Sequence, residues 1–187
     1  MEHLKKITLV FTLIFSTTSY GSEFSVEVDP ATYVFSGYAL HARYHFANHW
    51  ALSLGTYAMT FPKLLNREAI SPGSSSATLK IKSAYGLFLD RYLFNKNSGL
   101  FLGLQIARQN YQLSDSDYPG MRANYSATLI MPRLGYKYQL PHSRFYLLPW
   151  VGVGYVSPSV SHPSVGVQDY TIKSTLAFAT LHIGYTF

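Results

Sequence analysis

The C-terminal stretch, from Leu176 to Phe187, alternates apolar side chains with polar or small ones up to the last residue. Its apolar positions are Ala177, Ala179, Leu181, Ile183, Tyr185 and Phe187. A period of two indicates a β-strand with one apolar face. An apolar face that runs to the end of the chain is a liability on the edge of a soluble sheet. It suits a strand that faces lipid and closes a barrel, so the pattern favours a membrane barrel over a soluble one.

Similar alternation recurs along the chain and predicts eight strands, at residues 22–29, 33–46, 50–60, 78–92, 99–112, 122–140, 145–156 and 170–187. Short turns are expected near positions 48, 96 and 142, and longer connections between them, including the loop 61–77. Pro132 lies inside the sixth strand and predicts a bulge or kink there. The expected fold is all-β, a closed antiparallel eight-stranded up-and-down barrel with both termini on the periplasmic side.

Charged and histidine side chains gather on one face of these strands. The residues that we expect to point into the barrel are His41, Arg43, His45, Lys80, Lys82, Asp90, Arg133 and Lys137, together with Glu27. Eight strands enclose a space that side chains fill, so these charges should pair and plug the lumen. The alternative is a channel in which the same charges stay solvated. Aromatic residues near the short turns predict a periplasmic girdle, formed by Tyr44, Phe46, Trp50, Tyr92, Phe94, Tyr136, Tyr138 and Phe145.

Composition agrees with this interpretation. Aromatic residues make up 16 % of the chain and charged residues 13 %, whereas soluble domains have about 25 % charged residues. The absence of cysteine excludes a disulfide scaffold, a cysteine-ligated metal site and thiol catalysis. The net charge of +6 is expected to meet anionic lipid head groups or lipopolysaccharide phosphates, and not nucleic acid.

The N-terminus has the form of a secretory signal peptide. Lys5 and Lys6 precede the apolar run 7–15, which is too short to span a bilayer, and small residues follow up to Gly21. We therefore predict a cleaved signal peptide at residues 1–21 and a barrel domain at residues 22–187.

The chain resembles the small eight-stranded OmpA/OmpX-like barrels of bacterial outer membranes. The resemblance lies in GYALHARYHF-turn-WALSLG, in PRLGYKYQL-turn-FYLLPWVGVGY and in the terminal LHIGYTF. It implies an outer-membrane location and a C-terminal signal, carried by Phe187, Tyr185 and Ile183, that the barrel-assembly machinery reads. Barrels of this type include adhesion and host-interaction proteins, structural anchors, small channels and lipid A-modifying enzymes.

Histidine positions suggest two kinds of chemistry. His41 and His45 flank Arg43 on one strand face, a spacing that suits a metal or pH-sensing site, but the sequence fixes no carboxylate beside them. The ordinary alternative is a hydrogen-bond network near the periplasmic mouth. His162 and Ser164 resemble the His-x-Ser pair of lipid A deacylases, but they lie in a proline-rich loop without a convincing acid.

The pair His142–Ser143 lies in a turn and is no better placed. We therefore predict no catalytic residue, no cofactor and no metal ligand.

Five cations lie near the external end of the predicted barrel. They either contact lipopolysaccharide phosphates or are simply solvated, and they are Lys63, Arg67, Arg108, Arg122 and Lys173.

The function that we expect is that of an integral outer-membrane barrel with a structural or surface-interaction role, carried by its external loops. The loop 61–77 is the best candidate surface for a host or envelope protein. The alternatives are a channel for small solutes or hydrophobic molecules, and a lipid A-modifying hydrolase.

Overall fold

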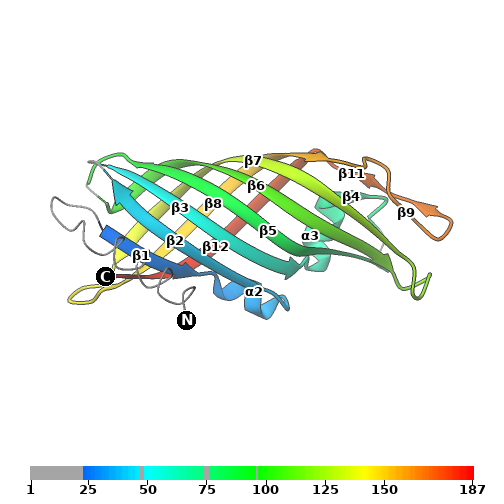
Figure 1. Ribbon diagram of the computed structural model, residues 1–187, viewed down its shortest axis with the longest axis horizontal. Coiled ribbons are helices and arrows are strands. Elements are labelled where there is room, and N and C mark those ends of the chain that lie inside the picture. Colours follow the sequence, from blue (N-terminus) through cyan, green and yellow to red (C-terminus); the bar gives the residue numbers. More distant parts are fainter. Residues whose placement is uncertain (1–22, 47–48, 74–75, 96) are drawn as a thin grey trace, which may run out of the picture.

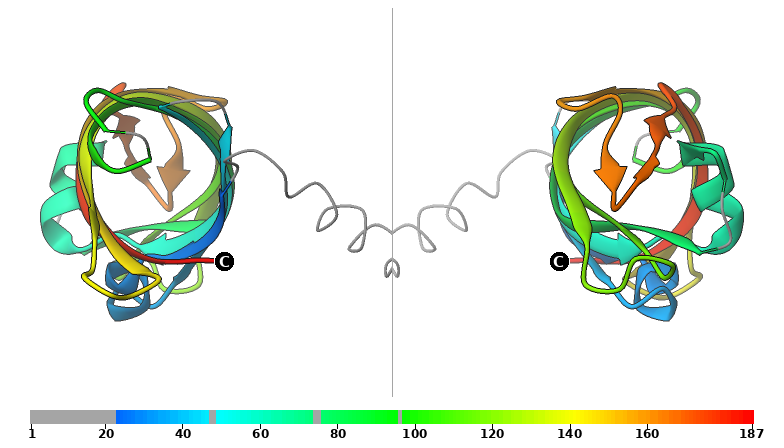
Figure 2. Two further views of the ribbon diagram at one scale, coloured as in Figure 1. Left: turned by 90° about the vertical axis from the view of Figure 1, so that its left-hand side faces the viewer. Right: turned by 90° about the vertical axis from the view of Figure 1, so that its right-hand side faces the viewer.

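The computed structural model describes residues 23–46, 49–73, 76–95 and 97–187. Within them, eight long strands pair in sequence order and close into an antiparallel barrel (Figure 1). They are β1 (Glu23–Val28), β2 (Tyr38–Phe46), β3 (Trp50–Thr60), β5 (Ala77–Tyr92), β6 (Gly99–Asp115), β7 (Arg122–Gln139), β8 (Phe145–Pro158) and β12 (Thr175–Thr186). β12 pairs with β1 to complete the ring, which Figure 2 shows end-on. The predicted fold class is confirmed, and the predicted signal peptide lies outside the described residues.

The two ends of the barrel differ in their connections. One end carries the short links from β2 to β3, from β5 to β6 and from β7 to β8, with the start of β1 and the C-terminus beside them (Figure 1). The other end carries every longer connection in the described residues. These contain α2 (Pro30–Val34), α3 (Lys63–Ala69), β4 (Ile70–Ser71), β9 (Ser164–Val165), β10 (Gln168–Asp169) and β11 (Thr171–Ile172). We call the two ends the short-turn end and the loop end.

Two strands begin later than the sequence predicts. Residues 30–34 form α2 because Pro30 suits the first helical turn and the Asp29 side chain caps it, accepting from Ala31 N at 2.9 Å. The second strand therefore starts at Tyr38, not at residue 33. Residues 171–172 pair with β4 in a separate two-stranded sheet, so the last strand starts at Thr175, not at residue 170.

The outer and inner faces of the barrel differ in polarity. Large apolar side chains stand exposed around the outside, among them Leu40, Tyr44, Leu52, Leu54, Leu87, Leu89, Leu102, Leu104, Ile106, Ile130, Leu134, Val151, Val153, Leu181 and Ile183. Charged side chains, among them Glu27, Arg43, Asp90 and Arg133, are buried inside. This distribution is that of a barrel that spans a membrane. Among the helices of the described residues, none is long and apolar enough to cross a bilayer.

A β-bulge in β5 changes which side chains face inward. Ile81 pairs with Tyr111 of β6, but the next aligned pair is Ser83 with Asn110, so β5 holds one extra residue at this point. The pairing of β5 with β3 shifts nearby. An extra residue reverses the side-chain alternation beyond it. Leu79 and Ile81 are therefore buried inside, although the sequence places them on the same face as the outward-facing Leu87 and Leu89.

The bulge predicted at Pro132 is absent. Pro132 pairs with Leu104 in an unbroken register between β6 and β7. On the other side, the pairs Ile130–Tyr155 and Arg133–Gly152 share one register. The proline removes one hydrogen-bond donor without adding a residue, so the register of β7 continues through it. The prediction of a bulge was wrong because a missing donor alone does not shift a register.

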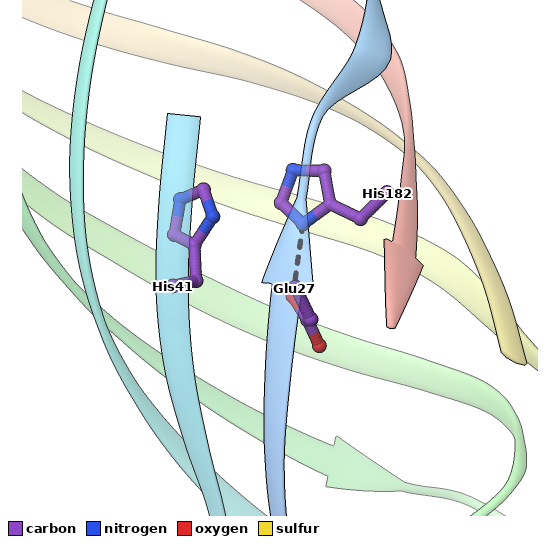
Figure 3. Close-up of side chains that lie close together, drawn as sticks. All are labelled: Glu27, His41 and His182. Carbon is purple, nitrogen blue, oxygen red and sulfur yellow. Dashed lines mark hydrogen bonds and ion pairs between the residues drawn. The ribbon is translucent and has the colours of Figure 1, made fainter. Parts of the chain in front are cut away.

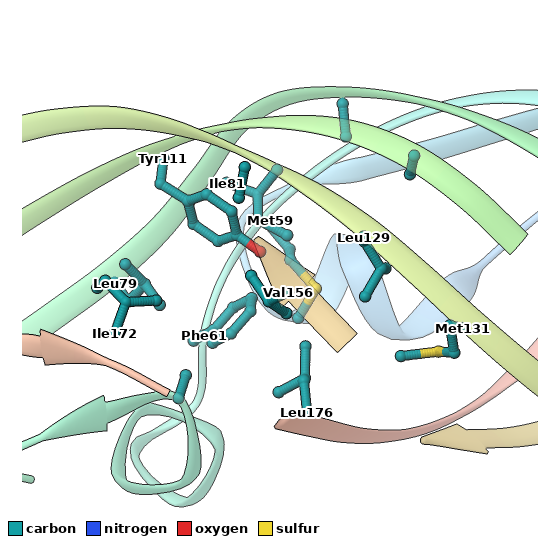
Figure 4. Packing of buried hydrophobic residues seen from close by; sticks show 14 of the residues in the cluster. Met59, Phe61, Leu79, Ile81, Tyr111, Leu129, Met131, Val156, Ile172 and Leu176 are labelled. Atoms are coloured by element: carbon teal, nitrogen blue, oxygen red, sulfur yellow. The ribbon is translucent and has the colours of Figure 1, made fainter. Parts of the chain in front are cut away.

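Apolar side chains fill the barrel interior at the loop end. Tyr111, Ile81, Met59, Leu129 and Val156 point inward from the strands (Figure 4). Phe61 and Ile172 close over them from the long connections. The loop end therefore has an apolar core inside, whereas the outer faces of its strands carry polar side chains such as Gln112 and Ser114.

Candidate functional site

A network of buried charges crosses the lumen between the short-turn end and the apolar core. Arg43 of β2 donates from Nη1 to Asp90 Oδ2 at 2.6 Å and from Nε to Glu27 of β1. Arg133 of β7 forms two parallel hydrogen bonds with Asp90, Nε to Oδ1 at 3.0 Å and Nη2 to Oδ2 at 2.7 Å. All four side chains are at most 1 % exposed. Two cations and two anions thus neutralise one another, as buried charges require.

Glu27 has two further hydrogen-bond partners, and a third residue bonds to one of them; none of the three was predicted as a site residue. Tyr146 donates its hydroxyl to Oε1 at 2.7 Å, and His182 Nδ1 lies 2.9 Å from Oε2 (Figure 3). Trp150 Nε1 donates to His182 Nε2 at 3.1 Å, which places the imidazole proton on Nδ1. A chain of hydrogen bonds therefore runs from Trp150 through His182 to Glu27. The alternation in β8 and β12 could have indicated that these side chains point inward. Only the register of the closed barrel, however, brings them close to Glu27 on β1.

Glu27, His41 and His182 come close enough to suggest a metal site. Their candidate ligand atoms lie within 4.8 Å of one another, and the two imidazole rings stack with centroids 4.7 Å apart (Figure 3). However, the hydrogen bonds occupy both nitrogens of His182, and Arg43 neutralises Glu27. A divalent cation bound at Nδ1 would displace the His182 proton to Nε2. The Nε2 proton and the Trp150 indole proton would then face each other as two donors. The geometry therefore favours a hydrogen-bond chain over metal coordination.

The remaining inward-facing residues of the predicted set lie nearer the short-turn end. Lys137 Nζ is 3.2 Å from His45 Nε2 and 4.3 Å from the ring centre of Tyr146. The His45 ring stacks on Tyr92, with centroids 5.6 Å apart. Tyr92 is 1 % exposed, so its predicted place in the outer girdle was wrong. Tyr92 is the last residue of β5 and points inward, and the link to β6 begins after it.

Side chains fill most of the interior between these layers. One internal cavity of about 50 Å³ lies where the charged network meets the apolar core, next to His41, Phe88 and Met131. That space accommodates about one or two water molecules. The lumen of the described residues thus matches the predicted plug, with an ionic layer and an apolar layer in series.

Lys80 and Lys82 do not lie in the lumen, contrary to the sequence prediction. Both face outward, because the bulge in β5 reverses the alternation beside Lys82. They share the outer face of β5, β6 and β7 with Arg108 and Arg122. Arg108 donates from Nη1 to Thr128 Oγ1 at 3.0 Å and from Nη2 to Ser126. The other outward side chains on this part of the strands are hydroxyls and amides, and Asp115 lines the same surface pocket as Lys80 and Arg122.

The five predicted external cations fall into two groups. Arg108 and Arg122 join the two lysines on the β5–β7 face. Lys63 and Arg67 lie on α3, outside the barrel ring and near β12 (Figure 2). Lys173 joins this second group, since its Nζ donates to Arg67 O at 2.8 Å.

The His-x-Ser residues do not form a catalytic pair. His162 Nδ1 lies 3.1 Å from Thr171 Oγ1, whereas Ser164 donates to Asp169 Oδ1 at 2.6 Å. The serine therefore bonds to an acid and not to the histidine. In the other pair, the Ser143 hydroxyl accepts from Phe145 N at 3.0 Å and caps the turn.

The C-terminal residues lie on the outer face at the seam between β12 and β1. Phe187 N donates to Phe24 O at 2.9 Å, and the two aromatic rings are 5.8 Å apart. Tyr185 packs against Phe187 with ring centroids 5.2 Å apart. Ile183 is outward-facing on the same strand.

The architecture is a closed eight-stranded antiparallel barrel with an apolar outer face. Among solved structures, the chain is similar to Ail, the attachment invasion locus protein of Yersinia pestis, with 14 % identity and a TM-score of 0.44. The match covers 89 % of this chain and 97 % of the Ail chain. No protein-family model matches the sequence, and no curated protein does.

Proposed function

We propose that this protein is an integral outer-membrane barrel whose external face binds anionic surface glycolipids, in particular the phosphates of lipopolysaccharide. The observation that supports this most strongly is the reversal of polarity along β6 and β7. Outward side chains on β6 change from Leu104 and Ile106 to Arg108 and Asn110. On β7 the change falls between Ile130 and Thr128, directly across the sheet. A bilayer that ends at this level covers the apolar side chains and leaves the loop end in the headgroup layer and beyond.

Aromatic side chains support the same orientation. Tyr136, Tyr138 and Phe145 are exposed at the short-turn end, where they suit the opposite membrane interface. The short-turn end then faces the periplasm. This agrees with the outer-membrane location that the resemblance implies, and with recognition of the C-terminal strand by the barrel-assembly machinery.

The outer face of β5–β7 provides the contact surface. Lys80, Lys82, Arg108 and Arg122 carry four positive charges, whereas one carboxylate, that of Asp115, lines the surface pocket beside Lys80 and Arg122. Phosphates attract such a face from a distance and accept charge-assisted hydrogen bonds on contact. The loop 61–77 offers less surface than the sequence suggests, because Phe61, Asn66 and Ile70 are buried.

Two observations argue against the alternative functions. The ion pairs and the apolar core fill the lumen that a channel for solutes would need open. The separation of His162 from Ser164 removes the arrangement that suggested a lipid A hydrolase. The surface-interaction role is therefore the one that the geometry supports best.

The test replaces Lys80, Lys82, Arg108 and Arg122 together by glutamine. Protein in phosphatidylcholine vesicles is titrated with lipopolysaccharide, and the control variant carries Asn110→Gln and Asn124→Gln on the same face. We expect at least a tenfold loss of affinity for the fourfold variant alone, and wild-type binding that weakens with salt and with dephosphorylated ligand. Equal affinity of the fourfold variant and the wild type would overturn the proposal.

A further inference from the structure

An open groove of about 740 Å³ lies on the outside of the barrel beneath α3, over parts of β6, β7, β8 and β12, and it includes none of the four cations of the β5–β7 face. Its floor is formed by small or short outward side chains on neighbouring strands. Ala177 of β12 pairs with Val153 of β8, and Ala179 pairs with Val151. Leu134 continues the second row on β7.

Larger side chains flank this floor. Thr175 and Tyr155 form the paired row nearer the loop end, and Tyr155 is 59 % exposed. Leu181 stands on the side toward the short-turn end, paired with Pro149. The depression therefore arises because β12 has two alanines in an outer face that is otherwise built from larger apolar side chains.

The helix α3 forms the roof of the groove and carries positive charge on its opposite, exposed face. Leu65 lines the groove, and the neighbouring Leu64 is exposed although apolar. Lys63 and Arg67 are one helical turn apart and exposed, and Glu68 is the acidic side chain of this helix. Lys173 adds a third cation through its hydrogen bond to Arg67 O.

An apolar groove below a cluster of cations matches one kind of molecule, a phosphate-bearing lipid. We propose that this groove holds an acyl chain of a phosphorylated lipid of the external leaflet, whose phosphate contacts Lys63 and Arg67. The inference rests on the proposed membrane orientation, which puts Ala177 and Ala179 within the apolar layer and α3 at its surface. It concerns other residues than the four cations of the β5–β7 face and specifies one tightly held lipid.

The experiment counts lipids that stay bound to the protein. Wild-type protein is reconstituted in phosphatidylcholine nanodiscs that contain bisphosphorylated lipid A, and native mass spectrometry then identifies what remains after the disc is removed. A double variant, Ala177→Leu with Ala179→Leu, fills the groove from outside. The matched control is Ala42→Leu, at an outward position on β2.

We expect one lipid A to remain on the wild type and on Ala42→Leu, and at least a tenfold lower retention on the groove-filled variant. Lys63→Gln with Arg67→Gln should abolish the preference for lipid A over phosphatidylcholine. If the groove-filled variant and the wild type retain equal amounts of lipid A and both migrate as folded, heat-modifiable barrels, the proposed lipid site in the groove is wrong, whereas the proposed function stands. A wild-type chain that does not enter the disc would overturn the proposed function as well.

Discussion

Arg133 holds Asp90 through two parallel hydrogen bonds across the barrel interior, at 3.0 Å and 2.7 Å. Asp90 also accepts from Arg43, so one carboxylate neutralises parts of two guanidinium groups. Strands β2, β5 and β7 thereby meet at a single side chain inside the lumen.

The replacement Asp90→Ala should therefore lower stability strongly. It leaves Arg43 and Arg133 buried with only Glu27 to balance them, and an unpaired buried charge costs about 3–5 kcal/mol. Urea unfolding of the barrel in lipid vesicles measures this loss. The control Asp169→Ala removes an exposed carboxylate in the external hairpin and should change the unfolding free energy by less than about 0.5 kcal/mol. Equal effects of the two replacements would count against a structural role for the ion network.

Gly103 of β6 makes room for the same ion pair. A Cβ atom at this position would lie 2.1 Å from Asp90 Oδ1 and 3.1 Å from Arg133 Cγ. Gly103→Ala should thus destabilise the barrel by about 1–3 kcal/mol through overpacking. In the Asp90→Ala background the same replacement should cost less, because the clashing carboxylate is gone. A double-mutant cycle measures the difference, and strict additivity would contradict the predicted contact.

Acid should loosen the external cap, by which we mean residues 164–172 at the loop end, through the contact between Asp115 and Tyr170 beyond the apolar band. The Tyr170 hydroxyl donates to Asp115, and this hydrogen bond lowers the pKa of Asp115. Since the pKa is lower in the folded protein, the contact stabilises the cap fully above the unfolded pKa of about 3.9 and is lost as pH falls through the folded value. Hydrogen-exchange protection of residues 164–172, measured relative to the intrinsic exchange rate at each pH, should therefore fall below about pH 4.

The variant Tyr170→Phe separates this effect from general acid unfolding. It removes the hydroxyl that donates to Asp115 and keeps the buried ring. Its cap should exchange faster at neutral pH and depend less on pH in the acid range. An unchanged pH profile in Tyr170→Phe would exclude the Asp115 contact as the cause.

Deletion of Phe187 should impair assembly of the barrel. The deletion removes the hydrogen bond to Phe24 O and two aromatic contacts at the seam that closes the ring. Heat-modifiable migration of protein from outer-membrane fractions reports folded barrel. Phe94→Ala, at an exposed aromatic in the turn after β5, provides the control and should assemble normally. Normal assembly without Phe187 would contradict a role for this residue in closure.

The sequence predicted the barrel well because most strands have one apolar and one polar face. The alternation in residues 38–46 places His41, Arg43 and His45 inward without any knowledge of the neighbours. The same logic failed at Lys80 and Lys82, because it assumes an unbroken period of two through residues 78–92. One extra residue in β5 breaks that period, and the run itself carries no glycine or proline at Lys82 to mark it.

The partners of Glu27 were beyond sequence analysis for another reason. Tyr146 and His182 are far from Glu27 along the chain, and only the closure of β12 on β1 brings them together. The parity of each strand could be predicted, but the register between strands depends on loops such as 159–174 whose path the sequence does not specify. The outer groove at Ala177 and Ala179 likewise depends on the pairing of β12 with β8, which the sequence does not specify.

We infer that the membrane ends where the outward side chains change from apolar to polar. Because the chain has no cysteine, single cysteines can be placed on either side of that boundary. Intact cells that carry Leu104→Cys, Leu134→Cys, Lys80→Cys or Gln112→Cys are treated with a membrane-impermeant maleimide. We predict rapid labelling at positions 80 and 112 and protection at positions 104 and 134. Equal labelling at all four positions would contradict this inference.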